Sequence, residues 1–218
     1  MSLVLGIDTA NDVRVGLARD GQVLVSLAVE DRRSHAELLL PLVRQAATEA
    51  GISLAELSDV VVGAGPGPFT GLRVGVAAAM TLAEVLGLDV KGVCSLDPIA
   101  LAWADRGDAP AEFVVVSDAR RKEVYWARYT ADGARVEGPL VTAPDQVPGL
   151  PLAGPGATLT GRAGSGPDVL DAAAMAAAID RLAEVGTEPL YLRRPDAEVP
   201  TTRKSTLLQP RIGMMGPR

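Results

Sequence analysis

The chain has 218 residues, of which 48% are hydrophobic and 22% charged, a balance typical of a globular protein and not of a disordered one. Its net charge of −6 excludes the overall positive charge by which many proteins bind nucleic acid on their own. Single copies of cysteine (Cys94) and histidine (His35) exclude an intramolecular disulfide and every His-pair metal motif. We therefore expect a cytoplasmic protein without a metal of its own. We also expect no membrane span, since no run of 18 apolar residues occurs. We expect no signal peptide, because Met1-Ser2-Leu3 leads straight into a strand pattern and not into a charged region followed by an apolar one.

The first half of the chain predicts three consecutive strands followed by alternating helices and strands. Asp20-Gly21 separates two strand-like runs and indicates a hairpin, because a tight turn needs positive φ at both positions. Ser34-x-x-Glu37 has the form of a capping box, and Thr70 is a second candidate cap. The expected elements are strands at 3–7, 13–18 and 22–29, a helix from Ser34 to Gly51 interrupted by Pro41, a strand at 59–64, a helix from Gly71 to about Leu86, a strand at 90–94 and a helix from Ser95 to about Arg106.

The second half repeats the opening pattern. Residues 113–119 resemble residues 3–9, and each run places an aspartate, Asp8 or Asp118, after its apolar stretch. Further strands are expected at 124–129 and through 135–136, on either side of a second Asp-Gly turn. This spacing predicts an internal duplication.

The copy is incomplete, because residues 138–167 are rich in Gly and Pro and lack periodicity. The expected domains are a first lobe at 1–108, an abbreviated second lobe at 109–194 and a basic tail at 195–218. The second lobe is expected to hold one Ala-rich helix, from about Pro167 to Val185, whose apolar face is formed by Val169, Leu170, Ala173, Ala177 and Leu182.

Two aspartates at the ends of equivalent strands are candidates for a metal–nucleotide site between the lobes. The candidate residues are Asp8, Thr9, Asp118 and Arg120. A phosphate cradle needs glycine close behind the aspartate so that the backbone can approach the oxygens. Because no glycine follows closely here, we expect a degenerate site. The alternative is that both aspartates are turn residues satisfied by backbone N–H groups.

A loop rich in glycine and proline joins the strand at 59–64 to the next helix. The loop could bind an anion at the helix N-terminus, but its two prolines remove N–H donors and no Gly-Lys-Ser/Thr follows. We therefore expect a rigid structural connector, built from Gly65, Pro66, Gly67, Phe69, Thr70 and Arg73.

The helix after this loop is apolar nearly all round. Gly71, Gly75 and Ala79 recur every four residues and form one stripe of small side chains. Because a surface helix normally has a polar face, this helix is expected either to lie wholly in the core or to bury a second face in a partner.

Several of these motifs together resemble the bacterial TsaB (YeaZ) family of the tRNA threonylcarbamoyladenosine system. The matching stretches are Ile7-Asp8-Thr9, His35 with Leu39-Leu40-Pro41, Gly65-Pro66-Gly67-Pro68-Phe69-Thr70-Gly71-Leu72-Arg73, Cys94-Ser95-Leu96, Asp118-Ala119-Arg120-Arg121 with Glu123-Val124-Tyr125, and Pro189-Leu190-Tyr191-Leu192-Arg193. The family usually has Ser where this chain has Pro68. The resemblance extends to about Arg194 and does not cover the tail.

The resemblance implies an α/β, actin-like fold of the ASKHA superfamily, duplicated from a ribonuclease-H-like unit, with two lobes that each open with a three-stranded β-meander. It implies no catalytic residue of its own and a partner role with the paralogue TsaD, which transfers threonylcarbamoyl to the adenosine next to the anticodon. It also implies binding by the ATPase TsaE, tRNA contact only through the complex, and a homodimer when the chain is alone. The implied partner surface comprises His35, Leu38, Leu39, Leu42, Gly71, Leu72, Gly75, Ala78, Ala79 and Leu82. The chain would hold no cofactor of its own. Whether ATP or ADP with Mg²⁺ binds at the interface with TsaD is left undecided by the resemblance.

Two other functions are kept as alternatives. A stand-alone actin-like ATPase or sugar kinase would use the cleft between Asp8 and Asp118 and would bind ATP. An M22-like glycoprotease would have to rely on His35, and the sequence supplies no recognisable nucleophile arrangement for it.

Overall fold

The computed structural model describes residues 2–30 and 35–193, with the side chain of His35 left out. Predictions for Ser34, the His35 side chain and the tail at 195–218 therefore lie outside the described part. The elements run in the order β1 (Leu3–Asp8), β2 (Val13–Arg19), β3 (Gln22–Val29), α1 (His35–Ala50), η1 (Leu54–Glu56), β4 (Asp59–Gly63), α2 (Phe69–Leu86), β5 (Val90–Val93), α3 (Asp97–Arg106), β6 (Glu112–Asp118), β7 (Val124–Thr130), β8 (Arg135–Thr142), η2 (Pro144–Gln146), β9 (Leu152–Ala153), η3 (Ala157–Thr160) and α4 (Ala172–Ala177).

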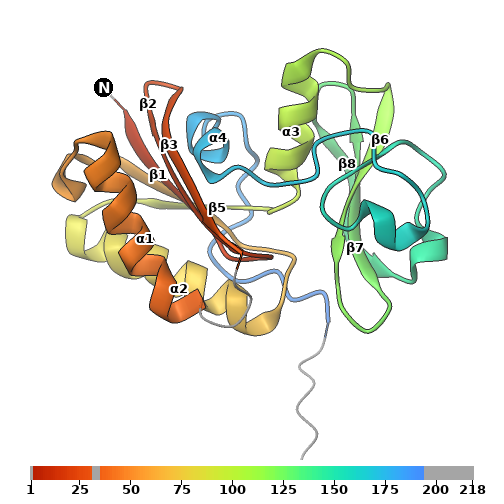
Figure 1. Ribbon diagram of the computed structural model, residues 1–218, viewed down its shortest axis with the longest axis horizontal. Helices are drawn as coiled ribbons and strands as arrows, with labels where there is room; N and C mark the ends of the chain where they lie inside the picture. Colours follow the sequence, from red (N-terminus) through yellow and green to blue (C-terminus); the bar gives the residue numbers. More distant parts are fainter. Residues whose placement is uncertain (1, 31–34, 194–218) are drawn as a thin grey trace, which may run out of the picture.

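Two sheets with the same topology confirm the duplicated fold. The first has the order β3-β2-β1-β4-β5 and the second β8-β7-β6-β9. Each opens with an antiparallel meander, and each central strand then pairs in parallel with a later strand, β1 with β4 and β6 with β9. Within the described residues the second sheet has no counterpart of β5, and β9 has only two residues. The two sheets lie on opposite sides of α3 (Figure 1).

Strands β1, β2 and β4 of the first sheet are buried on both faces, and strand alternation assigns their side chains to two cores. Leu5 and Ile7 point to the face covered by α1 and α2, whereas Val4 points to the face covered by α4. The core on the α4 side continues through α3 to Phe113 and Tyr129 of the second sheet. One apolar core therefore joins the two lobes.

Two glycines allow α4 to lie directly on the first sheet. Gly6 and Gly16 pair across β1 and β2. A Cβ at Gly6 would lie 2.1 Å from the carbonyl oxygen of Ala172, and one at Gly16 would lie 2.1 Å from the backbone nitrogen of Ala173. Asp171 caps the helix by accepting hydrogen bonds from the backbone of its first turn. Only glycine permits this close approach.

The predicted helix from Pro167 to Val185 is wrong in length, since α4 spans six residues. Val169 is also exposed and does not belong to its apolar face. After α4 the chain leaves the helical path and runs to the edge of the first sheet, where the backbone N–H of Val185 donates to the carbonyl of Gly92 in β5. Because α4 packs on β1, β2 and β3, the first lobe takes one of its layers from the region predicted as the second lobe, and the boundary at 108/109 does not separate two lobes.

The start of α2 also differs from the prediction. The helix begins at Phe69 with Pro68 in the N-cap position, so Thr70 lies inside the helix and is not its cap. By length and composition alone α2 could cross a membrane, but its inner face packs on β4 and β1, as in the core helix of a globular protein. Pro41 lies within α1, which continues through it to Ala50.

Candidate functional site

Asp8 lies at the end of the central strand β1 with only 2% of its surface exposed. Its carboxylate accepts hydrogen bonds from the Ser95 hydroxyl at 2.6 Å and from the backbone N–H of Ala10 at 2.9 Å. Burial raises the pKa of Asp8 from its ordinary value of 3.8 to about 6, although both hydrogen bonds oppose this shift. The Asp8 side chain is therefore enclosed by the protein and held by its own backbone and Ser95.

Gly63 provides the space for this carboxylate. A Cβ at Gly63 would lie 1.8 Å from Oδ2 of Asp8 and 2.6 Å from Oγ of Ser95, distances that no real side chain tolerates. A residue larger than glycine at the end of β4 is therefore incompatible with the observed position of Asp8.

Asp118 occupies the equivalent position at the end of β6. It is partly exposed, accepts a hydrogen bond from the backbone N–H of Arg120 at 2.7 Å, and pairs with the Arg120 guanidinium at 3.2 Å. Asp8 and Asp118 line one cavity between the lobes, as the duplicated sequence predicts. The cavity volume is about 30 Å³, enough for a water molecule but far too small for a nucleotide.

The other two predicted nucleotide residues do not face this cavity. Thr9 is fully buried, and its hydroxyl donates to the carbonyl of Gly71 at 2.7 Å. The same hydroxyl would lie 2.2 Å from a Cβ at Gly75, so Thr9 anchors α2 to the sheet. Arg120 is exposed at the surface and bound to Asp118. The four residues therefore do not form a nucleotide pocket in this structure.

A repeated four-residue motif was missed in the sequence. Ala64-Gly65-Pro66-Gly67 follows β4, and Ala153-Gly154-Pro155-Gly156 begins in β9, the equivalent strand of the second sheet. The first glycine of each motif has positive φ, +112° at Gly65 and +89° at Gly154. Both prolines, Pro66 and Pro155, line the cavity between Asp8 and Asp118. A search for identical short repeats would have found this second signature of the duplication.

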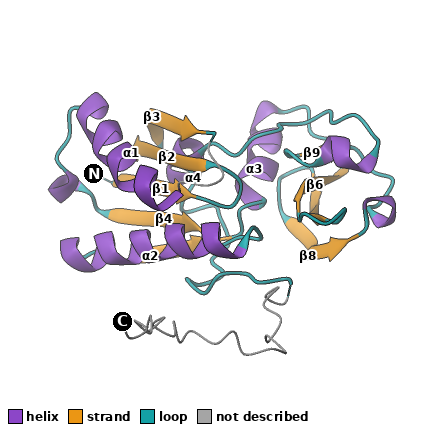
Figure 2. Cartoon of the chain, turned by 60° about the horizontal axis from the view of Figure 1, so that its bottom comes forward, coloured by secondary structure: helices purple, strands orange, loops and turns teal. Residues whose placement is uncertain are grey.

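The first turns of α2, directly after the glycine–proline loop, also contact the C-terminal part of the described chain. The ring of Phe69 lies 4.7 Å from that of Tyr191, centroid to centroid, and the Arg73 guanidinium lies 3.8 Å from the centre of the Phe69 ring. Arg73 also donates to the Tyr191 hydroxyl at 2.9 Å. Figure 2 shows the C-terminal segment passing beside the start of α2 on its way to the second lobe.

The stripe of small residues on α2 faces the sheet, so its assignment to a partner surface is wrong for this structure. Gly71, Gly75 and Ala79 are buried, and Gly75 lies against Thr9. Five other residues predicted for the partner surface are also buried or half-buried inside the lobe: Leu38, Leu39, Leu42, Leu72 and Leu82. Ala78 is half-buried as well.

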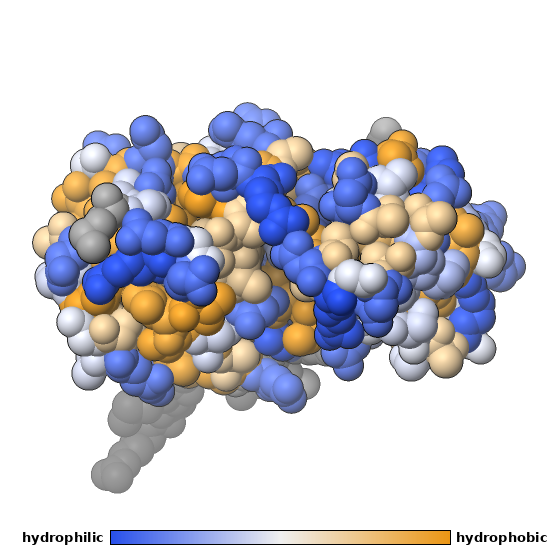
Figure 3. All heavy atoms as spheres, turned by 90° about the horizontal axis from the view of Figure 1, so that it is seen from above, coloured by the Kyte–Doolittle hydropathy of each residue, from blue (hydrophilic) through white to orange (hydrophobic). Residues whose placement is uncertain are grey.

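The outer face of the α1/α2 layer nevertheless carries exposed apolar side chains. Leu40 of α1 is 47% exposed and Met80 of α2 is 48% exposed, and Val85 is exposed near the end of α2. Seen from above, with α2 on the far side, apolar residues also gather over the first lobe, at the left, and a hydrophilic band crosses the middle of the molecule (Figure 3). We call Leu40, Met80 and Val85 the outer apolar face.

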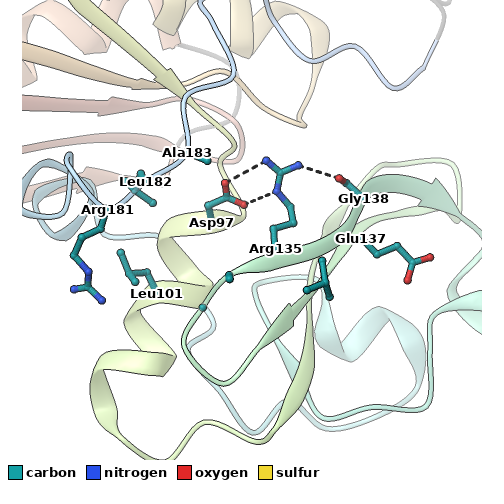
Figure 4. A pocket seen from close by; sticks show the side chains of 11 residues that line it. Asp97, Leu101, Arg135, Glu137, Gly138, Arg181, Leu182 and Ala183 are labelled. Carbon is teal, nitrogen blue, oxygen red and sulfur yellow. Dashed lines mark hydrogen bonds and ion pairs between the residues drawn. The ribbon is translucent and has the colours of Figure 1, made fainter.

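A second hollow, of about 590 Å³, lies between α3, the start of β8 and the segment after α4. Asp97 and Arg135 face each other across it, with Nε of Arg135 3.0 Å from Oδ1 of Asp97 (Figure 4). The hydroxyl of Tyr129 also donates to Asp97, at 2.8 Å, and Arg135 donates to the carbonyl of Gly138. These charged groups pair with one another and are not free to bind a ligand. We therefore interpret the Asp97 contacts as a structural link that fixes α3 against the second sheet.

Residues 28–199 match the family described as TsaD, tRNA N6-adenosine threonylcarbamoyltransferase. The chain belongs to this family. An uncharacterized protein of Mycobacterium tuberculosis H37Rv is 46% identical over 209 residues, which cover 91% of this chain and 95% of the relative. The Escherichia coli K12 protein named tRNA threonylcarbamoyladenosine biosynthesis protein TsaB is 37% identical over 131 residues, or 59% of this chain and 55% of TsaB.

A solved structure of YeaZ from Pseudomonas aeruginosa is also similar to this TsaD-family chain. It is 30% identical in sequence, covers 88% of this chain and all of the YeaZ chain, and superimposes with a TM-score of 0.69. The chain is thus a TsaB/YeaZ-like protein with an actin-like fold, as its motifs predict.

Proposed function

We propose that this TsaB/YeaZ-like chain is a non-catalytic subunit of a TsaD-containing complex that transfers a threonylcarbamoyl group to the adenosine next to the anticodon of tRNAs. Its similarity to TsaB supports a role in tRNA threonylcarbamoyladenosine biosynthesis. We propose in addition that the complex works in the cytoplasm, that the ATPase TsaE binds it, and that the chain forms homodimers when TsaD is absent.

The observation that carries this proposal is the contrast between a closed cleft and an open helical layer. The cleft that an actin-like ATPase or sugar kinase would use is reduced to about 30 Å³, with Asp8 buried inside it. The outer apolar face, in contrast, is available to a partner. Apolar patches on an otherwise polar surface are typical of protein–protein contacts.

The partner surface is tested by charge substitution on this face. Met80→Glu places a carboxylate within the proposed contact, and we expect it to weaken binding to the cognate TsaD at least tenfold, measured by light scattering and calorimetry. Val136→Glu on β8 is the matched control, because Val136 is 49% exposed against 48% for Met80. The control variant should bind TsaD like the wild type.

The subunit role is tested by reconstituting transfer to tRNA. TsaD should require this chain for full activity, and Met80→Glu should reduce the activity in parallel with binding. Full transfer by TsaD without the chain would overturn the proposal. If calorimetry instead detects binding of Mg-ATP to the chain alone, the stand-alone ATPase or sugar kinase becomes the better explanation.

A further inference from the structure

Three segments that are far apart in the sequence form one basic strip on the side of the molecule that carries the start of α2. Arg73 of α2 donates to Tyr191 of the C-terminal segment. Two residues later, Arg193 donates to the carbonyl of Ala119 at 2.7 Å and pairs with Glu123 at 3.0 Å, both in the β6–β7 turn. That turn contains Arg120, Arg121 and Lys122. We call Arg73, Arg120, Arg121, Lys122 and Arg193 the basic strip.

The strip is locally positive although the whole chain is acidic. Two carboxylates next to these five cationic side chains, Asp118 and Glu123, are each already in an ion pair with a strip arginine. The ion pair of Arg120 with Asp118 is half-exposed. Such pairs are weak in water and can be exchanged for a stronger anionic partner.

The β6–β7 turn presents its basic residues in an unusual conformation. Arg120, Arg121 and Lys122 all have positive φ, at 64°, 51° and 62°, which non-glycine residues adopt only at a cost. In the β2–β3 hairpin positive φ falls on Asp20 and Gly21, and in the β7–β8 hairpin it falls on Gly133.

Hydrogen bonds within this turn and contacts from Arg193 hold it in place. Glu123 N–H donates to the carbonyl of Arg120 at 2.9 Å, and Arg193 bonds both flanks of the turn. Positive φ in consecutive residues, maintained by surrounding contacts, is typical of functional segments.

Aromatic rings lie at the other end of the strip. The Phe69 and Tyr191 rings pack together, and Tyr191 is exposed beside the Arg73 guanidinium. The surface therefore offers one exposed aromatic ring, that of Tyr191, beside a row of cations. RNA-binding surfaces combine these two features, since phosphates attract the cations and unpaired bases stack on rings or guanidinium planes.

We propose that the basic strip is a contact surface for the phosphate backbone of an RNA strand. The assignment of tRNA as that RNA rests on the proposed function. An acidic protein partner would use the cations but not the aromatic end, so RNA is the better fit.

The test uses the full chain in complex with TsaD and a fluorescein-labelled, unmodified tRNA transcript as probe. Arg121→Asn with Lys122→Asn removes two charges, and asparagine adopts positive φ readily, so the turn is kept. Arg106→Glu, on α3, is the control, because Arg106 is exposed and the substitution changes the net charge by the same amount. Fluorescence anisotropy is measured at several salt concentrations.

The double variant should raise the Kd for tRNA about tenfold and reduce the slope of log K against log salt by about 1 to 2, whereas Arg106→Glu should leave that slope unchanged. Equal slopes for the two variants would overturn the RNA contact. The RNA contact would also be overturned if the double variant assembles less well with TsaD while the complex that still forms binds tRNA with unchanged affinity. That result would identify the basic strip as a protein contact. If no complex with TsaD forms, the proposed function fails, and the slope measured with the chain alone at low salt decides the role of the strip.

Discussion

The position of Gly63 allows a sharp test of the closed cleft. In Gly63→Ala the new methyl group would lie 1.8 Å from the Asp8 carboxylate and 2.6 Å from the Ser95 hydroxyl. Both side chains must move, which breaks their 2.6 Å hydrogen bond. Overpacking costs about 1–3 kcal/mol and a lost hydrogen bond to a carboxylate about 1.5–3 kcal/mol. We therefore expect a loss of about 4 kcal/mol in the free energy of unfolding.

For a chain of this size that loss lowers Tm by about 8–16 °C, measured by calorimetry and checked by urea unfolding. Gly149→Ala is the control, because a Cβ there meets no atom within 4 Å, and it should change stability by less than about 0.5 kcal/mol. In an Asp8→Ala background the clash is partly relieved, and the cost of Gly63→Ala should fall by at least about 1 kcal/mol. Equal stability of the Gly63 and Gly149 variants, or an undiminished cost in the Asp8→Ala background, would refute the geometry.

Two further predictions concern buried polar groups. Because the folded pKa of Asp8 is about 6 and its ordinary value 3.8, the folded state binds the proton more tightly, and the contribution of Asp8 to stability is present below pH 4 and lost as the pH rises to about 6. Urea unfolding should show the free energy of unfolding of the wild type falling relative to Asp8→Asn by up to about 3 kcal/mol over this range, and a constant difference would contradict the assigned burial. Tyr129→Phe removes the hydrogen bond to buried Asp97 and should cost about 1–2 kcal/mol in thermal unfolding. Tyr191→Phe removes an exposed bond to Arg73 and should cost less than about 0.5 kcal/mol, so equal losses would argue against the structural link at Asp97.

Most of the fold could be predicted because the strands carry their own signals. The apolar runs that end at Asp8 and Asp118, with an Asp-Gly turn after each second strand, correctly indicated two meanders. α4 was the main error. The alanines at 172–174 and 176–178 favour a helix in any context, but the following chain runs to the edge of the first sheet, where Val185 bonds to Gly92.

The candidate site was predicted in part. The sequence placed Asp8 and Asp118 opposite each other, and both do line the cavity between the lobes. Periodicity could not show which side of α2 meets the sheet, because a helix that is apolar nearly all round has no marked inner face. The stripe through Gly75 therefore suggested a partner, whereas it packs against Thr9.

The sequence by itself determined the duplicated α/β architecture, because alternation, turn residues and the spacing of two aspartates are local properties of the chain. It also carried the motifs that identify the family. Only the tertiary structure decided that Gly63 and Ser95 enclose Asp8, that α4 completes the first lobe, and that Arg73, Arg193 and the β6–β7 turn form one basic strip. Each of these depends on contacts between segments separated by tens of residues, which no local pattern encodes.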